Sequence, residues 1–163
     1  MYKGQTRFLH KEQIDHLWEV QGNSRHPRAL RDGAILALLL ESALTVRTLL
    51  ELNIGDLDLD GRRLFLRTQK SEAQLKLEKC IQALRAYVND GRPELSYQPD
   101  EPALFISQTG GRMSRQSVWQ VLRQWGRKAG LPFTLSPRLV RHTAVVELLE
   151  GGRTAEELQT MLG

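Results

Sequence analysis

The spacing of apolar residues changes twice along this chain. As far as Leu52 they recur every three or four positions, the period of an amphipathic helix. From Leu57 to Leu77 they alternate with polar residues, the period of a strand with one buried face. After Leu77 the helical period returns. We therefore predict a mostly α fold with a small three-stranded antiparallel sheet near its middle.

Three helices are predicted before the sheet. The first spans His10–Gln21. The second begins at Pro27, a residue favoured in the first turn of a helix, and continues to about Ser42 with apolar residues dense enough for a central buried element. A third, shorter helix begins at Thr45. The residues expected to face the core are Ile14, Leu17, Trp18, Leu30, Ala34, Ile35, Leu38, Leu39, Leu49, Leu50 and Leu52.

Three pairs of leucines indicate the strands. They are Leu57 with Leu59, Leu64 with Leu66, and Leu75 with Leu77. Gly61 is expected to form the first turn, and Gln69–Ala73 the second, with Lys70 at its tip. Asp56, Asp58 and Asp60 alternate with the first pair, so we expect them on the solvent face of the first strand. They lack the glycine-bearing loop pattern of a calcium site.

A fourth helix follows the sheet, and a loop separates it from the C-terminal half. The helix carries Ile81, Leu84, Tyr87 and Val88. The loop, from Gly91 to Pro102, is rich in proline and polar residues and leads to an apolar run, Leu104 to Ile106. We expect Tyr87 to lie in the core or on the helix surface.

Three helix starts are marked by capping residues in the C-terminal part. Ser114 is typical of an N-cap and predicts a helix to about Ala129. Ser136 followed by proline predicts a second helix, to about Glu150. Thr154 with Glu157 forms a capping box for a short last helix. The buried face of the first of these helices is predicted to hold Val118, Val121, Leu122 and Trp125.

Composition restricts the class of protein. The chain has 163 residues, 40% of them hydrophobic and 26% charged, which fits one folded domain. The longest apolar stretch, Ala34 to Leu40, is shorter than a membrane span, and the N-terminus is too polar for a signal peptide. Cys80 is the single cysteine, which we expect to be a buried residue on a helix and which suits a reducing cytosol. We expect a cytoplasmic protein without a disulfide, metal or organic cofactor.

Charge is distributed unevenly along the chain, although the net charge is only +4. No Asp or Glu occurs from Gly110 to His142. The basic residues of this acid-free segment are Arg112, Arg115, Arg123, Arg127, Lys128, Arg138 and Arg141. A segment of one sign suits a surface that binds a polyanion, because each cation placed at a phosphate releases counterions.

Three strings in this order resemble the catalytic domain of the tyrosine recombinase (phage integrase) family. They are FLHKEQIDHLWEV, LFISQTGGRMSRQSVWQVLRQWGRKAGL, and SPRLVRHTAVVELLEGG with LQTMLG. The second is similar to the family's strand, Gly-rich turn and basic helix, and the third to its Arg-His-Thr helix. The resemblance implies that family's fold over residues 1–163 as a single domain, without the separate N-terminal core-binding domain.

The resemblance also implies a catalytic chemistry. In the family, a tyrosine attacks a DNA phosphodiester, two arginines hold its oxygens, a lysine on a β-turn protonates the leaving oxygen, and a histidine assists. Arg141 matches the second arginine, and Lys70 matches the lysine. His142 is expected to pack within the fold.

Two family positions are substituted. Thr45 stands where the family has its first arginine, between Ala43 at a glycine position and Thr48 at a glutamate position. Arg47 lies two residues beyond Thr45 and would need a remodelled turn to reach the phosphate. Arg138 stands at the position of the assisting histidine, and an arginine cannot act as a base.

No tyrosine of the chain lies at the place of the family's nucleophile. Tyr2, Tyr87 and Tyr97 are all far upstream of it. We therefore expect a domain that binds double-stranded DNA, at the nucleoid, but that is catalytically impaired as given. The candidate DNA contacts are Arg47, Lys70, Arg112, Arg115, Arg123, Arg138 and Arg141.

Two other functions stay open. One is an active recombinase fragment, truncated before its tyrosine, in which Arg47 and Arg138 supply substitute phosphate contacts. The other is a helical protein-interaction or assembly module that self-associates through the last helix, with Leu158, Met161 and Leu162 as its apolar face.

Overall fold

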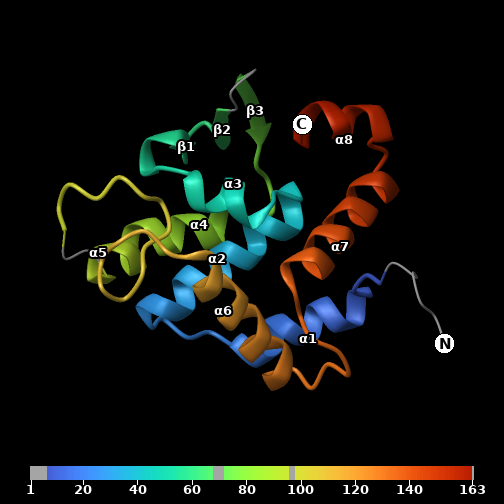
Figure 1. The fold of residues 1–163 in the computed structure, drawn as a ribbon, viewed down its shortest axis with the longest axis horizontal. Helices are drawn as coiled ribbons and strands as arrows, with labels where there is room; N and C mark the ends of the chain where they lie inside the picture. The colour runs from blue at the N-terminus through green and yellow to red at the C-terminus, as the bar shows by residue number, and fades with distance from the viewer. Residues whose placement is uncertain (1–6, 68–71, 96–97, 163) are drawn as a thin grey trace.

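A computed structural model describes residues 7–67, 72–95 and 98–162. Helix α2 (Pro27–Ser42) runs through the middle of the molecule, and the remaining helices and the sheet surround it (Figure 1). The side chains from Ala34 to Leu36 are fully buried, as is Leu38. The predicted central helix is therefore confirmed, with the predicted bounds. Within the described residues, no helix combines the length and the apolar content that crossing a bilayer requires.

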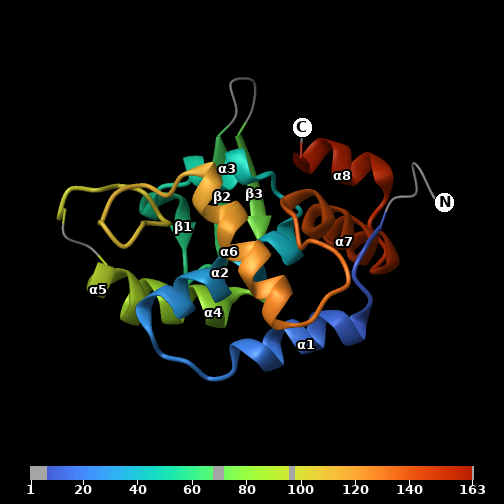
Figure 2. The same ribbon diagram turned by 60° about the horizontal axis from the view of Figure 1, so that its bottom comes forward.

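The elements on either side of α2 in sequence are α1 (Lys11–Gln21) and α3 (Val46–Glu51). α1 packs against α6 (Arg115–Lys128), where Trp18 meets the edge of Trp125 with ring centroids 5.5 Å apart. The indole nitrogen of Trp125 donates to the carbonyl oxygen of Leu17 at 2.6 Å. The C-terminal half of the chain is thus packed directly onto its first helix, as Figure 2 shows.

The sheet is three-stranded and antiparallel, as predicted, in the order β1 (Leu57–Asp58), β2 (Arg63–Arg67), β3 (Glu72–Lys76). Leu64 of β2 lies opposite Leu57 on one side and Leu75 on the other. Leu64 is fully buried and Leu75 is 3% exposed, so this row of leucines attaches the sheet to the core.

The prediction for the acids around the first strand is wrong for Asp56. That residue lies in a 3-10 turn, η1 (Ile54–Asp56), before β1 begins. Its carboxylate accepts the backbone N–H of Asn53 at 2.8 Å, and its side chain is only 14% exposed. Asp58 accepts the N–H of Gly61 at 2.9 Å. Asp56 therefore closes a turn before the strand, because a short acidic side chain readily bonds to nearby backbone N–H groups. Asp58 lies on the exposed side of β1, as predicted, and also closes the turn at Gly61.

The fourth helix is longer than predicted. α4 (Ile81–Ala86) continues through a π-helical turn, η2 (Tyr87–Gly91), into α5 (Arg92–Leu95). The predicted loop start at Gly91 is therefore wrong, because the chain is still helical from Gly91 to Leu95. The Arg92 guanidinium donates to the carbonyl oxygens of Glu101, Ala103 and Leu104, which attaches α5 to this later part of the chain.

Tyr87 is a core residue. Its side chain is fully buried, and its hydroxyl donates to the carbonyl of Leu104 at 2.8 Å while it accepts the N–H of Ile106 at 3.1 Å. Burial raises the pKa of Tyr87 to about 12. Its ring stacks on Phe105 with centroids 5.4 Å apart. Tyr87 therefore holds the chain from Leu104 to Ile106 against the helices.

The apolar run that ends at Ile106 does not form the strand that the resemblance implied. It makes two isolated bridges, Asn53 to Ala103 and Ile106 to Arg112, outside the three-stranded sheet. Cys80 is fully buried as expected, at the N-cap of α4. Its backbone N–H donates to the carboxylate of Glu41 at 2.7 Å, which joins α4 to α2.

The three predicted C-terminal helix starts are confirmed. Ser114 caps α6, and its hydroxyl accepts the N–H of Ser117. Ser136 caps α7 (Pro137–Glu150) in the same way. Thr154 and Glu157 make both bonds of the capping box that opens α8 (Ala155–Leu162).

The predicted apolar docking face of α8 is wrong at Leu158. This side chain is only 6% exposed, because it already packs within the molecule. The side chains of Met161 and Leu162 lie outside the described part of the chain. Leu158 cannot therefore contribute to an exposed surface for a second protomer.

Candidate nucleic-acid interface

One hydrogen bond joins α7 to the corner between α2 and α3. The Nε atom of Arg141 donates to the carbonyl oxygen of Ala43 at 3.0 Å. Ala43 has a left-handed backbone (φ 57°), and its N–H closes the end of α2 at Leu39. Among the described residues, no acid lies within 4.0 Å of Arg141. In the described part of the chain, neither of its two terminal nitrogens has a hydrogen-bond acceptor.

The start of α3 carries hydroxyl groups instead of charge. The Thr45 hydroxyl accepts the N–H of Thr48 at 3.2 Å, and the two hydroxyl oxygens lie 3.1 Å apart. Thr45 is therefore the N-cap of α3. Arg47 is 81% exposed and pairs with Glu51, one turn further along the same helix, at 3.2 Å. The arginine nearest to Thr45 in sequence is thus directed along α3 by an ion pair of its own.

The start of α7 carries two arginines but few free backbone donors. Arg138 is exposed and Arg141 is half-buried. Pro137 has no N–H, the Leu139 N–H donates to the Ser136 hydroxyl, and the Val140 N–H donates to the Ser136 carbonyl. Within the described residues, Arg138 is left as the first-turn residue whose N–H can serve a ligand. Side-chain charge therefore dominates this site.

The outer face of α6 combines cations with an aromatic ring. Arg115, Trp119 and Arg123 recur every four residues, so they share one side of the helix. Both arginines are exposed, and Trp119 is 39% exposed, which is unusual for an indole. This Arg-Trp-Arg stripe can offer a polyanion both charge and an apolar surface.

Sequence reasoning missed Trp119. It selected Arg115 and Arg123 by charge and assigned apolar residues of α6 to the buried face. The four-residue spacing from Trp119 to each of those arginines was the signal that could have found it.

Arg112 has three acceptors inside the molecule. Its Nη1 donates to the carbonyl oxygens of Leu50 at 2.6 Å and Leu52 at 3.1 Å, and its Nη2 donates to Oδ1 of Asn53 at 2.6 Å. The first two are carbonyls at the C-terminal end of α3, where a cation is favoured. Arg112, although exposed, thus has three of its five N–H donors engaged within the described structure.

Two further residues singled out by the sequence are Lys70 and His142. Lys70 falls within 68–71, outside the described residues. His142 is half-buried on α7, next to Arg141. In the described ranges, no group of three or more His, Cys, Asp or Glu side chains is arranged to hold a metal ion.

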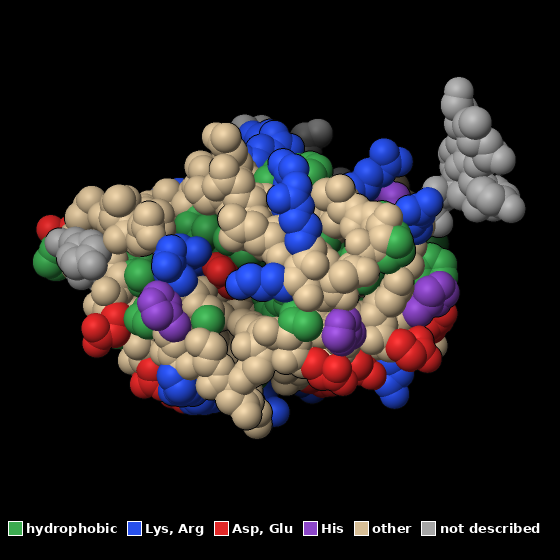
Figure 3. Space-filling model, turned by 90° about the horizontal axis from the view of Figure 1, so that it is seen from below, with side chains coloured by type: hydrophobic (Ala, Val, Ile, Leu, Met, Phe, Trp, Pro, Cys, Tyr) green, Lys and Arg blue, Asp and Glu red, His purple; other side chains and the backbone are tan. Residues whose placement is uncertain are grey.

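Charge is also uneven on the surface that Figure 3 shows. Lys and Arg side chains stand out in the upper half of this face, whereas most of the acidic side chains visible there lie along its lower edge. The cations in the upper half therefore have few carboxylates beside them, apart from an acidic side chain visible near the centre of the face.

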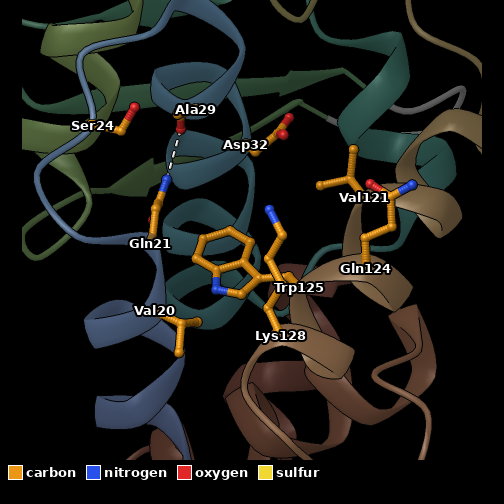
Figure 4. Close-up of a pocket in the computed structure, with 9 residues that line it drawn as sticks. All are labelled: Val20, Gln21, Ser24, Ala29, Asp32, Val121, Gln124, Trp125 and Lys128. Carbon is orange, nitrogen blue, oxygen red and sulfur yellow. Dashed lines mark hydrogen bonds between the residues drawn. The ribbon is translucent and has the colours of Figure 1, made fainter.

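A pocket of about 210 Å³ opens between α1, α2 and α6 (Figure 4). The side chain of Lys128 extends past Trp125 toward Asp32, whose carboxylate points away from it. Burial raises the pKa of the Asp32 carboxyl even though Arg31 bonds to it at 2.9 Å. The Asp32 carboxyl in the pocket lining thus has cations of the protein itself, Arg31 and Lys128, beside it.

The chain matches one family over nearly all of its length. The model of the phage integrase family covers residues 7–163. Tyrosine recombinase XerD of Mycobacterium tuberculosis is 35% identical over 140 residues, which cover 84% of this chain and 45% of that protein. Tyrosine recombinase XerC of Herpetosiphon aurantiacus is 32% identical over 163 residues, which cover 96% and 53%. The chain spans about half the length of these curated relatives.

Solved structures share the fold. The crystal structure of XerA recombinase superposes with a TM-score of 0.82 at 26% identity, over 96% of this chain and 56% of that one. XerH site-specific recombinase bound to difH substrate, in a pre-cleavage complex, gives a TM-score of 0.77 at 17% identity, over 99% and 48%. The mostly helical fold with its small sheet is therefore that of the tyrosine recombinase catalytic domain.

Proposed function

The chain belongs to the phage integrase family, and on that premise we propose that it binds duplex DNA as a domain of the tyrosine recombinase type. The observation that carries the proposal is the set of exposed cations in the acid-free segment, on the outer face of α6 and at the start of α7. XerH site-specific recombinase, a protein with this fold, is bound to difH substrate in its solved structure.

Arg141 is the central phosphate contact in this proposal. Its Nε bond to Ala43 fixes the guanidinium plane, which leaves Nη1 and Nη2 to donate to two oxygens of one phosphate. Arg138, three residues earlier on the same helix face, reaches the same strand. Arg115 and Arg123 contact phosphates along α6, and Trp119 packs against sugar or base edges.

Cleavage by this chain as given is not part of the proposal. A neutral Thr45 cannot neutralise the charge that develops at phosphorus, and Arg138 cannot accept a proton. Tyr87 cannot attack a phosphate, because it is fully buried with both lone-pair and proton engaged by Leu104 and Ile106. The retained Arg141 favours a second function, strand transfer by a longer protein that supplies the nucleophile.

The salt dependence of binding tests the proposal. Affinity for a fluorescent duplex of about 30 base pairs is measured by anisotropy from about 50 to 200 mM salt, where several phosphate contacts weaken binding by orders of magnitude. Arg123→Ala lowers the slope by about one unit. The matched control is Arg85→Ala, an exposed arginine of α4 outside the acid-free segment, which keeps the wild-type slope. Absence of binding at low salt refutes the proposal.

A nicked suicide substrate separates binding from cleavage. We expect no protein–DNA species on a denaturing gel with the 163-residue chain. A covalent species would refute DNA binding without cleavage and support strand transfer instead.

A nucleoid location in cells is a further consequence of DNA binding. Coincidence of a fluorescently tagged chain with a DNA stain tests it.

A further inference from the structure

Arg112 connects three elements of the fold, which are α6, α3 and the sheet. It is two residues before Ser114, which caps α6. Its guanidinium reaches the C-terminal end of α3, about 60 residues earlier in the sequence, through the carbonyls of Leu50 and Leu52. The first turn of α6 and the last turn of α3 are therefore tied by one side chain.

A second set of contacts extends from Arg112 to the sheet. Nη2 of Arg112 donates to Oδ1 of Asn53, and the backbone N–H of Asn53 donates to the Asp56 carboxylate at 2.8 Å. Asp56 in turn lies 4.0 Å from Nε of Arg67, the last residue of β2. Arg112 is thus the first member of a contact chain that ends at β2.

The fork geometry of the guanidinium is what these contacts require. Two carbonyl oxygens and one amide oxygen accept from different N–H groups of one rigid plane. Ser107 and Gly111 close the preceding turn, where the N–H of Ser107 donates to the Gly111 carbonyl at 2.7 Å. This turn gives Arg112 a fixed backbone from which to reach α3.

We propose that Arg112 is a positioning residue for DNA binding, which orients α6 against α3 and β2 and does not itself neutralise a phosphate. This rests on the proposed DNA-binding function. It differs from the expectation drawn from charge alone, in which Arg112 is one more phosphate contact. The two assignments predict different salt slopes for Arg112→Ala. They also predict different DNA affinities for Asn53→Ala, which changes an uncharged partner of Arg112, and for Arg112→Lys.

Salt slopes provide the first test. Arg112→Ala is expected to weaken binding to the duplex about tenfold at every salt concentration, with an unchanged slope, because three internal bonds are lost and no phosphate contact is. Arg112→Lys keeps the charge but not the fork, so we expect a loss of similar size. Arg123→Ala is the matched comparison, with a slope lowered by about one unit. A slope lowered by Arg112→Ala and restored by Arg112→Lys would overturn the proposal.

Asn53, the uncharged side chain that accepts from Arg112, provides the second test. Asn53→Ala removes the acceptor of Nη2 and no charge, so a direct phosphate contact by Arg112 predicts no effect on DNA binding. We expect a several-fold loss, and a double variant no weaker than Arg112→Ala alone, since both changes break one contact chain. Full additivity, or no loss in Asn53→Ala, contradicts the proposal.

A distance measurement without DNA separates this proposal from the function on which it rests. Spin labels are placed at Arg47→Cys on α3 and Gln116→Cys on α6, in a Cys80→Ala background, since Cys80 is the single cysteine. We expect a narrow distance distribution that broadens in Arg112→Ala while the helical circular dichroism is kept. An unchanged distribution overturns the positioning role, whatever the DNA result. If the wild type does not bind DNA but the distribution broadens, the structural tie stands and the DNA-binding function fails.

Discussion

The starts of α3 and α7 have the same kind of N-cap but differ in the charge of the side chains that follow it. Each begins with a hydroxyl N-cap, Thr45 or Ser136, that accepts an N–H three residues on. At α7 two arginines follow the cap, whereas at α3 the cap is joined to a second threonine and Arg47 is paired with Glu51. The difference shows that local helix stability and phosphate binding are separate requirements, and that α3 meets only the first.

The bond between Arg141 and Ala43 makes these two regions depend on each other. Nε is bonded to Ala43, while the terminal nitrogens have no acceptor among the described residues, so in the proposed interface one side chain serves both the corner and the DNA contact. Removal of the Arg141 side chain should affect stability and binding together, while removal of the Thr45 hydroxyl should affect stability alone. The predictions below separate these cases.

The largest effect is expected for Arg141→Ala. Loss of a charged donor to phosphate should weaken duplex binding by roughly 1 to 3 kcal/mol for any DNA sequence and lower the salt slope by about one unit. Loss of the bond to Ala43 should also lower the melting temperature. Anisotropy titrations and thermal denaturation of the same variant measure both. A lower melting temperature with an unchanged slope would remove Arg141 from the DNA contacts.

The next effect is a gain. Thr45→Arg places a cation at the start of α3, in the family's first arginine position, and should tighten duplex binding about tenfold at low salt, with a slope increased by about one unit. The matched control is Thr45→Lys, which adds the same charge without a planar fork and should gain less. If neither variant tightens binding, the corner does not face the DNA backbone.

The helix starts and the sheet could be predicted from the sequence because the interactions that form them are local. Pro27, Ser114 and Ser136 act through their nearest neighbours in sequence, so the helices that they begin were predicted with the observed starts. The row of leucines in the sheet was predictable from the period of two. The same period was misleading at Asp56, which fits the alternation of a strand but lies in the turn before it and accepts the N–H of Asn53.

The site was less predictable because its decisive contacts are long-range. The acceptors of Arg112 lie about 60 residues away, and the acceptor of Arg141 lies 98 positions away. No pattern within one element contains this information. Charge alone therefore placed Arg112 and Arg123 in one group, although only Arg112 donates to acceptors within the described structure, through three of its five N–H groups.

A smaller effect, on stability alone, is expected for Thr45→Ala. Removal of the N-cap leaves the Thr48 N–H without its side-chain acceptor and should lower the free energy of unfolding by about 1 kcal/mol. Thr45→Ser keeps the hydroxyl and should be close to wild type. Urea denaturation measures the stability, and the salt slope of DNA binding should stay unchanged in both variants. A lowered slope in Thr45→Ala would mean that the corner does contact phosphate.

The smallest effect is expected for Arg138→Gln, which removes charge from the exposed side of the α7 start. Because Arg138 is fully in reach of solvent and ions, its contact with a phosphate should contribute less than that of Arg141, about 0.5 to 1 kcal/mol at low salt, and should be screened at high salt. The melting temperature should not change, since Ser136 continues to cap the helix. Arg138→Lys retains the charge and should retain the affinity. A loss as large as that of Arg141→Ala would show that the half-buried position of Arg141 and its bond to Ala43 add nothing to phosphate binding, and the contrast between the two helix starts would then reduce to the number of charges.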